Sequence, residues 1–187
     1  MIDPLLDIAL LGGSFNPPHV GHLMAAVFAK TIIGCDEVWL VPSLNHPFGK
    51  VLAPFDDRIA MCELMGVDLG PWFKVSRAEE AVDGEGRTIE LLEYLLPQHP
   101  NAKFRWIIGS DILADLPKWR SWDRIASMVN VTVLHRAGYP SDEAVGPALA
   151  QVSSSEIRAA LERGVEPMGL VTQSVHSYIR QRKLYGL

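Results

Sequence analysis

Two histidines lie three positions apart at the start of a predicted helix, where side chains can meet an anion. The segment Gly12-Gly13-Ser14-Phe15-Asn16-Pro17-Pro18-His19-Val20-Gly21-His22 follows a short apolar run. One helical turn puts both imidazoles on the same face, where each can donate a hydrogen bond to a phosphate oxygen. Free backbone N–H groups and the helix dipole at such a start also favour an anion. The segment therefore predicts a phosphate site.

The residues alone leave other interpretations of this segment open. An H-x-x-H pair is commonly a cap or a core pair. Zinc binding is less favoured, because no H-E-x-x-H run and no matching third ligand accompany His19 and His22. The glycines match neither the G-x-G-x-x-G dinucleotide fingerprint nor a Walker A loop.

A second segment, Ser153-Ser154-Ser155-Glu156-Ile157-Arg158, combines hydroxyls with a cation. The spacing of Ser153 and Glu156 is that of a capping box and predicts a helix that begins at Ser154. Arg158 then lies near the positive end of that helix, at a cost of about 0.3–1 kcal/mol. A broken local rule of this kind indicates a compensating anion, either a bound phosphate or Glu156 itself.

Two further side chains follow a predicted strand that ends at Gly109. Asp111 fits a helix N-cap or a contact to a hydroxyl or a metal-bound water. We expect a loop bounded by Pro117 after this strand, in which Trp119 fits ordinary packing or stacking on a flat ring.

The elements that must position these residues alternate between strands and helices. Apolar or β-rich runs predict strands over 8–11, 37–41, 72–76, 104–108 and 131–134, and helical spacing predicts helices over 21–31, 56–65, 88–96, 154–163 and 174–182. We expect long loops over 42–54 and 138–152. This alternation predicts an α/β fold with a mostly parallel sheet and helices on both faces, and a ligand site at the carboxyl ends of its strands.

Composition narrows the class of protein further. The 187 residues carry 17 Lys and Arg against 22 Asp and Glu, a net charge of −5, which argues against a nucleic-acid partner. Two cysteines are too few for a disulfide framework. Residues 8–29 carry no charge, but their prolines, histidines and Asn16 argue against a membrane span, and no basic leader is visible. We expect a cytoplasmic protein without a membrane partner.

Residues 13–22 closely resemble the G-[ST]-F-[DN]-P-x-H-x-G-H signature of the nucleotidylyltransferase superfamily, and residues 153–158 resemble its I-S-S-T-x-[IV]-R motif. Residues 109–111 and 116–122 are similar to the G-x-D…W segment of bacterial nicotinate-nucleotide adenylyltransferases. Lys50, Arg58, residues 135–139 and the Tyr178-Ile179…Leu184-Tyr185 pattern extend the resemblance over nearly the whole chain. The resemblance implies one Rossmann-like nucleotidylyltransferase domain over residues 1–187.

The resemblance also implies a reaction, in which the AMP moiety of ATP is transferred to nicotinate mononucleotide to give deamido-NAD and pyrophosphate in NAD biosynthesis. The implied catalytic residues are His19, His22, Lys50 and Arg158. The implied ATP site comprises Gly12, Gly13, Ser14, Phe15, His19, His22, Gly109, Asp111, Ser154, Ser155 and Arg158. The implied mononucleotide site comprises Lys50, Thr88, Asp111, Trp119 and Arg120. Mg²⁺ is expected to bind mainly through the ATP phosphates, without protein metal ligands.

The chain departs from the family pattern in the late motif, where Val152 and Ser155 replace the usual Ile and Thr and a hydroxyl is kept, and at two other places. Gly86-Arg87-Thr88 stands where the family often has Ser-Tyr-Thr, and the spacing between His46 and Lys50 differs from the common His-Lys pair. Alternative functions are another nucleotidylyltransferase, such as a phosphopantetheine adenylyltransferase or a cytidylyltransferase, and a nucleotide-binding module without catalysis. The segment 117–122 argues against the first, and intact His19, His22 and Arg158 argue against the second. A homo-oligomer is compatible with the sequence.

Overall fold

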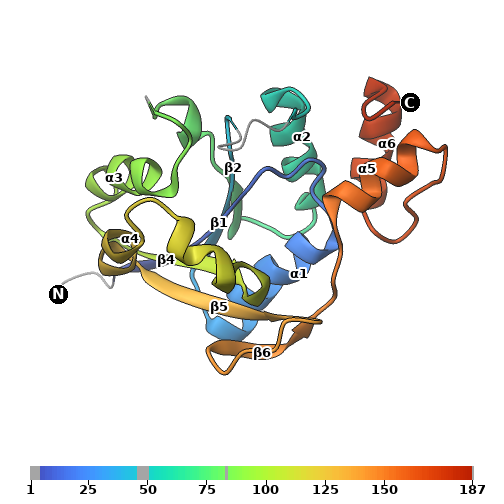
Figure 1. The fold of residues 1–187 in the computed structure, drawn as a ribbon. Helices are drawn as coiled ribbons and strands as arrows, with labels where there is room; N and C mark the ends of the chain where they lie inside the picture. The colour runs from blue at the N-terminus through green and yellow to red at the C-terminus, as the bar shows by residue number, and fades with distance from the viewer. Residues whose placement is uncertain (1–4, 46–50, 83, 187) are drawn as a thin grey trace.

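A single twisted sheet organises the chain in the computed structural model, which describes residues 5–45, 51–82 and 84–186. Its six strands have the order β3-β2-β1-β4-β5-β6, and each neighbouring pair in the described residues is parallel (Figure 1). Their bounds are β1 (Leu6–Gly13), β2 (Glu37–Pro42), β3 (Phe73–Val75), β4 (Ala102–Gly109), β5 (Asn130–Arg136) and β6 (Ala144–Leu149). The predicted parallel α/β fold is confirmed, with the strand order of a Rossmann-like sheet.

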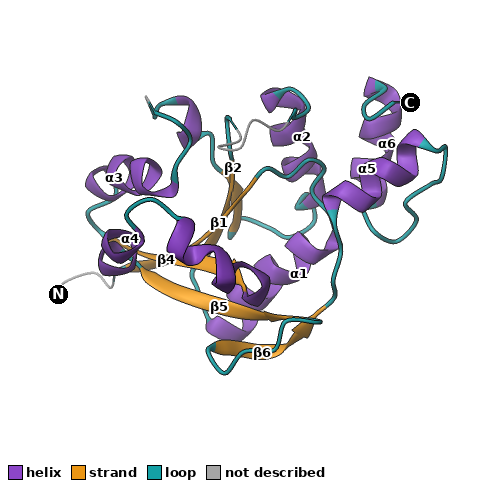
Figure 2. Cartoon of the chain, in the orientation of Figure 1, coloured by secondary structure: helices purple, strands orange, loops and turns teal. Residues whose placement is uncertain are grey.

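Helices cover both faces of the sheet, as the alternation predicts (Figure 2). One face carries α1 (Val20–Phe28), α2 (Phe55–Met65), α5 (Ser154–Glu162) and α6 (Gln173–Arg182). The other face carries α3 (Thr88–Gln98), α4 (Trp122–Met128) and a 3-10 segment, Ser110–Lys118. A π-helical turn, Ala29–Ile33, continues α1, and a short 3-10 turn, Ala78–Glu80, follows β3.

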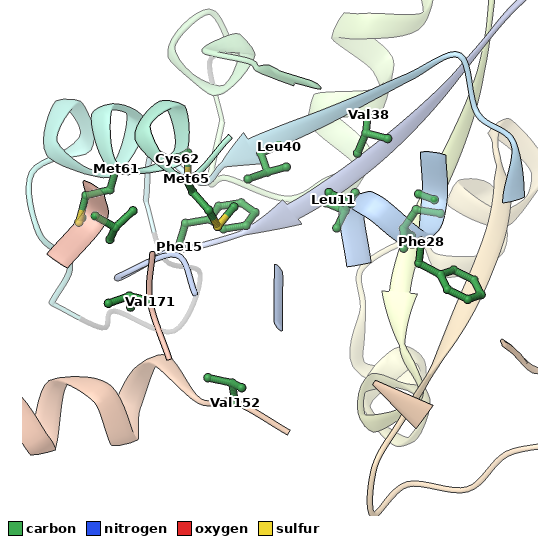
Figure 3. Packing of buried hydrophobic residues seen from close by; sticks show 14 of the residues in the cluster. Leu11, Phe15, Phe28, Val38, Leu40, Met61, Cys62, Met65, Val152 and Val171 are labelled. Carbon is green, nitrogen blue, oxygen red and sulfur yellow. The ribbon is translucent and has the colours of Figure 1, made fainter. Parts of the chain in front are cut away.

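The core divides into two clusters because side chains alternate along each strand. In β1, Ile8 and Leu10 pack toward α3 and α4, whereas Ala9 and Leu11 pack toward α1 and α2. Phe15, just beyond β1, joins the second cluster, with Met61, Cys62 and Met65 of α2 (Figure 3). The functional loop after β1 is therefore anchored in the core by one aromatic ring.

Two expectations about elements are wrong. The predicted loop over 138–152 contains β6, whose central residues Val145, Gly146, Pro147 and Ala148 are all exposed at the sheet edge. Gly and Pro signal a loop, but an edge strand tolerates both, since its outer N–H groups need no partner. The stretch after Gly109, expected to be a loop, forms the 3-10 segment and α4.

The strand order reverses between β1 and β4, each of which has its next partner on the opposite side. The loops that leave the carboxyl ends of these two strands must run in opposite directions, which opens a crevice between them. No helix in the described ranges is long and apolar enough to cross a membrane.

Candidate active site

A cavity of about 250 Å³ lies at the carboxyl ends of β1, β4 and β5. Its lining includes six of the residues predicted for the site: Gly12, Phe15, His22, Gly109, Asp111 and Trp119. Residues far apart in the sequence thus meet at the strand-order reversal, where α/β proteins bind ligands.

His19 and His22 form one stacked unit at the start of α1. Their ring centroids lie 3.7 Å apart with an interplanar angle of 19°. The backbone N–H of His19 donates to Nδ1 of His22 at 3.2 Å, so a neutral His22 carries its proton on Nε2. His22 also lines the cavity and meets the ring of Phe15 edge-on at 4.7 Å. This arrangement fixes a neutral N–H donor at the cavity wall.

Both imidazoles are held in the neutral state. Burial, helped by the positive charge of Arg136, lowers the pKa of His19 from 6.5 to about 4. Burial lowers the pKa of His22 well below its ordinary value, and the charges of His19 and Arg136 act in the same direction. At neutral pH the pair therefore offers oriented hydrogen bonds without bringing full charges.

Gly12 and Gly21 each leave room for a neighbouring ring that a Cβ would crowd. A Cβ on Gly12 would lie 2.6 Å from Cη2 of Trp106, the indole that closes the cavity floor. A Cβ on Gly21 would lie 3.1 Å from Cε1 and Nδ1 of His19. Glycine inside a helix costs stability relative to alanine. At Gly21 this cost is offset because the missing Cβ leaves room for the ring of His19.

The start of α5 is joined to the loop after β1 by two hydrogen bonds. The Ser154 hydroxyl donates to the Pro17 carbonyl at 2.8 Å, and Nη1 of Arg158 donates to the Asn16 carbonyl at 2.6 Å. Nη2 of Arg158 reaches the Ser155 hydroxyl at 3.2 Å. The predicted residues Ser154, Ser155 and Arg158 therefore come to the histidine loop, and Arg158 has a local partner other than Glu156.

The helix boundary at Ser154 is confirmed, but the predicted capping box is wrong. Ser153 is the N-cap and makes no side-chain cap hydrogen bond. In the described ranges, the Ser154 and Ser155 amides have no hydrogen-bond acceptor. A helix start with unpaired amides is a place where an oxyanion can bind. At α1, in contrast, the Leu170 carbonyl already accepts from the Val20 amide at 2.9 Å.

Asp111 and Arg136 face each other across the carboxyl ends of β4 and β5. Nε of Arg136 lies 3.6 Å from Oδ2 of Asp111, and its Nη2 donates to the Val152 carbonyl at 2.8 Å. Ser110 secures this corner, since its hydroxyl accepts from the Arg136 amide and donates to the Tyr139 carbonyl. Arg136 lines the cavity, yet the sequence analysis gave it no role; its position directly after a buried strand was the available signal.

A buried arginine ties together the loops around the site. Arg58 is 1% exposed, and its guanidinium donates to the carbonyls of Ser14, Ser43, Leu44 and Ala53 at 2.7–3.2 Å. The Ser43 amide in turn donates to the Gly13 carbonyl. Gly13 and Ser14 thus hold the loop in place through their backbone oxygens.

Thr88 and Arg120 do not line the cavity; they belong to a separate group near the start of α3. Thr88 is the first residue of α3, after Arg87. The Glu85 carboxylate pairs with Arg87, and Nη1 of Arg120 lies 3.9 Å from it. The two cations share the Glu85 carboxylate, and the Glu90 carboxylate lies beside them, where it accepts from the Glu85 and Arg87 amides. Lys50 and His46 lie outside the described residues.

Three buried side-chain atoms of the described chain lack a hydrogen-bond partner: His19 Nδ1, Trp106 Nε1 and Asp111 Oδ1. They belong to the histidine pair and to two residues of the cavity lining. Unpaired buried polar atoms are costly, so a water or ligand that supplied their partners would be bound favourably here. No cluster of three His, Cys, Asp or Glu side chains that could hold a metal ion occurs among the residues described.

Comparison with known proteins gives a family match, two sequence relatives and a similar solved fold. A family model described as cytidylyltransferase-like matches residues 10–160. A probable nicotinate-nucleotide adenylyltransferase of Myxococcus xanthus is 50% identical over 98% of this chain and 97% of its own length. Another, from Anaeromyxobacter sp. (strain K), is 48% identical over 96% of each chain. The solved Plasmodium falciparum nicotinic acid mononucleotide adenylyltransferase complexed with NaAD has a TM-score of 0.80, 20% identity, and coverage of 96% of this chain and 97% of that chain; that likeness shows the fold alone.

Proposed function

The chain belongs to the nicotinate-nucleotide adenylyltransferase family, within the cytidylyltransferase-like proteins, and we propose that the cavity at the ends of β1, β4 and β5 is where it performs that family's reaction. The enzyme transfers the adenylyl group of ATP to nicotinate mononucleotide, giving deamido-NAD and pyrophosphate in NAD biosynthesis. The residue roles that follow are our proposal.

The reaction requires positioning and charge stabilisation more than proton transfer. The 5′-phosphate oxygen of nicotinate mononucleotide bonds to the α-phosphorus of ATP while the bond to the bridging α–β oxygen breaks, and pyrophosphate leaves with that electron pair. The attacking phosphate is already ionised near neutral pH, so no protein base is needed. Preorganised donors aimed at the leaving phosphates stabilise the charge that develops there.

His22 Nε2–H, the Ser154 and Ser155 amides and the free N–H groups of Arg158 are the donors for the triphosphate. Hydrogen bonds already place Arg158 and Ser154 against the loop that carries His22. His19 stacks on His22 and orients it. Lys50 would add a cation from the segment after β2. Gly12, Gly13, Ser14, Phe15 and Gly109 shape the ATP site through backbone and packing.

Mg²⁺ would bind mainly through the ATP phosphates. One carboxylate of the chain, that of Asp111, lies where it could contact a water bound to this ion. Asp111 borders the cavity, and its Oδ1 is buried without a partner. Such an oxygen can accept from a metal-bound water or a ribose hydroxyl. When bound, the cation neutralises phosphate charge.

The mononucleotide would lie against Trp119 and Asp111 on one side and the start of α3 on the other, where Thr88 and Arg120 lie. Trp119 borders the cavity and packs perpendicular to Trp122, with ring centroids 5.9 Å apart; we propose that its indole stacks on the pyridine ring. We propose that the whole chain forms one domain, since α5 and α6 pack into the same core cluster as α1 and α2. A cytoplasmic location and any self-association stay predictions.

The observation that carries the proposal is the meeting of His22, Asp111, Trp119 and Arg136 around one cavity at the strand-order reversal. Pyrophosphate release tests it, with ATP and Mg²⁺ supplied alongside a panel of mononucleotides. We expect nicotinate mononucleotide to be the best acceptor. Faster release when phosphopantetheine is the acceptor, release only when CTP replaces ATP, or no release with any acceptor tested would contradict the proposal.

A further inference from the structure

Asn16 joins three segments that are distant in sequence. Its side chain is buried, and Oδ1 accepts from the Ala53 amide at 3.1 Å and from the Tyr185 hydroxyl at 2.9 Å. Its backbone carbonyl accepts from Arg158 at 2.6 Å. One residue of the signature loop therefore fixes the approach to α2, the turn after α6 and the start of α5.

The Tyr185 hydroxyl is a dependable donor in this contact. Burial raises the pKa of Tyr185 above its ordinary value, so the phenol keeps its proton at neutral pH. Tyr185 also packs against the core cluster that holds Phe15 and the inner faces of α5 and α6. Its ring position is therefore set by packing, and the hydroxyl transmits that position to Asn16.

The side chain and the carbonyl of Asn16 are attached through one Cα, so hydrogen bonds that anchor the side chain also restrain the backbone whose carbonyl receives Arg158. The next carbonyl along the loop, that of Pro17, receives Ser154. Residues 16 and 17 thus present two consecutive acceptors to α5. The orientation of these acceptors determines where the remaining N–H groups of Arg158 and the amides of α5 point.

We propose that Tyr185 is a positioning residue for ATP: through Asn16 it holds Arg158 and the start of α5 in the orientation that binds the triphosphate. The proposal rests on the proposed function, because it takes Arg158 and α5 to be phosphate ligands. Tyr185 itself contacts no substrate in this scheme.

A matched pair of variants tests the proposal. Tyr185→Phe removes the hydroxyl bonded to Asn16. Tyr178→Phe removes a hydroxyl of the same kind, which donates to Asp57 of α2 at 2.8 Å; Asp57 keeps Arg182 as a donor at 2.9 Å. Both changes loosen the attachment of the C-terminal helix α6 and its following turn, but only the first reaches the signature loop.

We expect Tyr185→Phe to raise the Kd and the KM for ATP roughly 3- to 10-fold, the range that one neutral hydrogen bond gives. In Tyr185→Phe, the KM for the mononucleotide should change less than about 2-fold, because the hydrogen bond to Asn16 positions only ATP ligands. In Tyr178→Phe, where that bond is intact, every kinetic constant should change less than about 2-fold. Thermal melts of both variants separate stability from binding, with assays run well below either Tm. Equal ATP affinity in the two variants would reduce Tyr185 to a structural role and overturn the proposal.

Calorimetric titration of ATP and Mg²⁺ into four proteins then shows whether Tyr185 acts through Arg158. The proteins are the wild type, Tyr185→Phe, Arg158→Ala and the double variant. If Tyr185 acts through Arg158, its removal changes ATP affinity much less when Arg158 is absent. Two effects that simply multiply would contradict the route through Arg158. A wild type that binds no ATP would instead overturn the proposed function, so the two failures are distinguishable.

Discussion

The rings of His19 and His22 stack with centroids 3.7 Å apart, and the backbone N–H of His19 occupies Nδ1 of His22. Only Nε2 of His22 is then left to donate toward the cavity. We expect His22→Ala to lower kcat about 10²-fold or more, because a donor to developing phosphate charge is worth roughly 2.7–4 kcal/mol. We expect a comparable loss for His19→Ala. Steady-state pyrophosphate release measures both, and melting curves check the fold.

His22→Asn distinguishes catalysis from capping. An Asn amide oxygen can accept from the His19 N–H, as Nδ1 does, but it places no donor where Nε2 lies. If the donor matters, His22→Asn should be as inactive as His22→Ala. Activity restored by Asn would show that His22 serves as a helix cap.

The lowered pKa values of the two histidines predict how stability varies with pH. The unfolded chain takes up these protons near pH 6.5, whereas folded His19 does so near pH 4. The unfolded state therefore binds more protons in that window. The contribution of the neutral histidines to the free energy of unfolding is full above pH 6.5 and declines as the pH falls toward 4. Urea unfolding at about pH 7.5 and about pH 5 gives the loss of unfolding free energy between the two pH values. We expect this loss to be larger for the wild type than for a His19→Asn/His22→Asn variant, by on the order of 1–3 kcal/mol. Parallel pH dependence in the two proteins would refute the burial of neutral histidines.

Gly21→Ala should separate stability from activity. Alanine favours a helix by about 1 kcal/mol over glycine, but its Cβ would lie 3.1 Å from the His19 ring. We expect an unchanged or higher Tm together with a loss in kcat/KM of about 10-fold, since small displacements of positioned groups are costly. A variant with a raised Tm and full activity would show that the position of His19 is not critical.

Nicotinate mononucleotide should be preferred over nicotinamide mononucleotide by at least about 10-fold in kcat/KM. We propose that backbone amides near Thr88 and Arg120 receive the ring carboxylate, where an amide NH₂ would face a donor and leave it unpaired. Side-by-side kinetics decide: equal efficiency, or a preference for the amide, would overturn the nicotinate assignment.

Trp119→Ala should weaken both mononucleotides and leave ATP affinity nearly intact, since the indole is proposed to stack only on the pyridine ring. Trp72→Ala is a matched control, because Trp72 lies before β3 and packs edge-on against Phe73. Calorimetric titrations of each substrate check both variants. A loss of ATP affinity in Trp119→Ala would move Trp119 to the adenosine side of the site.

The sequence predicted most of the sheet because strands β1, β2 and β4 are mostly apolar, as strands that lie between two layers of helices must be. It missed β6, since the exposed pattern around Gly146 and Pro147 resembles a loop, and it missed α4, which begins after Ser121 with a left-handed backbone (φ 60°). A residue other than glycine in that conformation is uncommon and has no reliable local signature.

Within the site, local motifs predicted the histidine loop and the start of α5 but not the contacts between them. The hydrogen bond from Arg158 to Asn16 spans 142 positions, and no spacing rule reaches that far. The pairing of Asp111 with Arg136 depends on the register of β4 against β5. The sequence analysis matched Arg58 to the family pattern only; its burial and its hydrogen bonds to backbone carbonyls of three segments depend on the fold. The residue types indicated the chemistry, and the fold determined the partners.

The bond from Tyr185 to Asn16 joins residues 169 positions apart. On the ribosome, the signature loop emerges long before Tyr185 has been made. A growing chain then carries its histidines and its glycine-rich turn in final order while Asn16 still lacks the partner that orients it. Any folding intermediate in which α6 and its following turn have not yet docked therefore lacks this bond, and its signature loop holds Arg158 less firmly than the finished fold does.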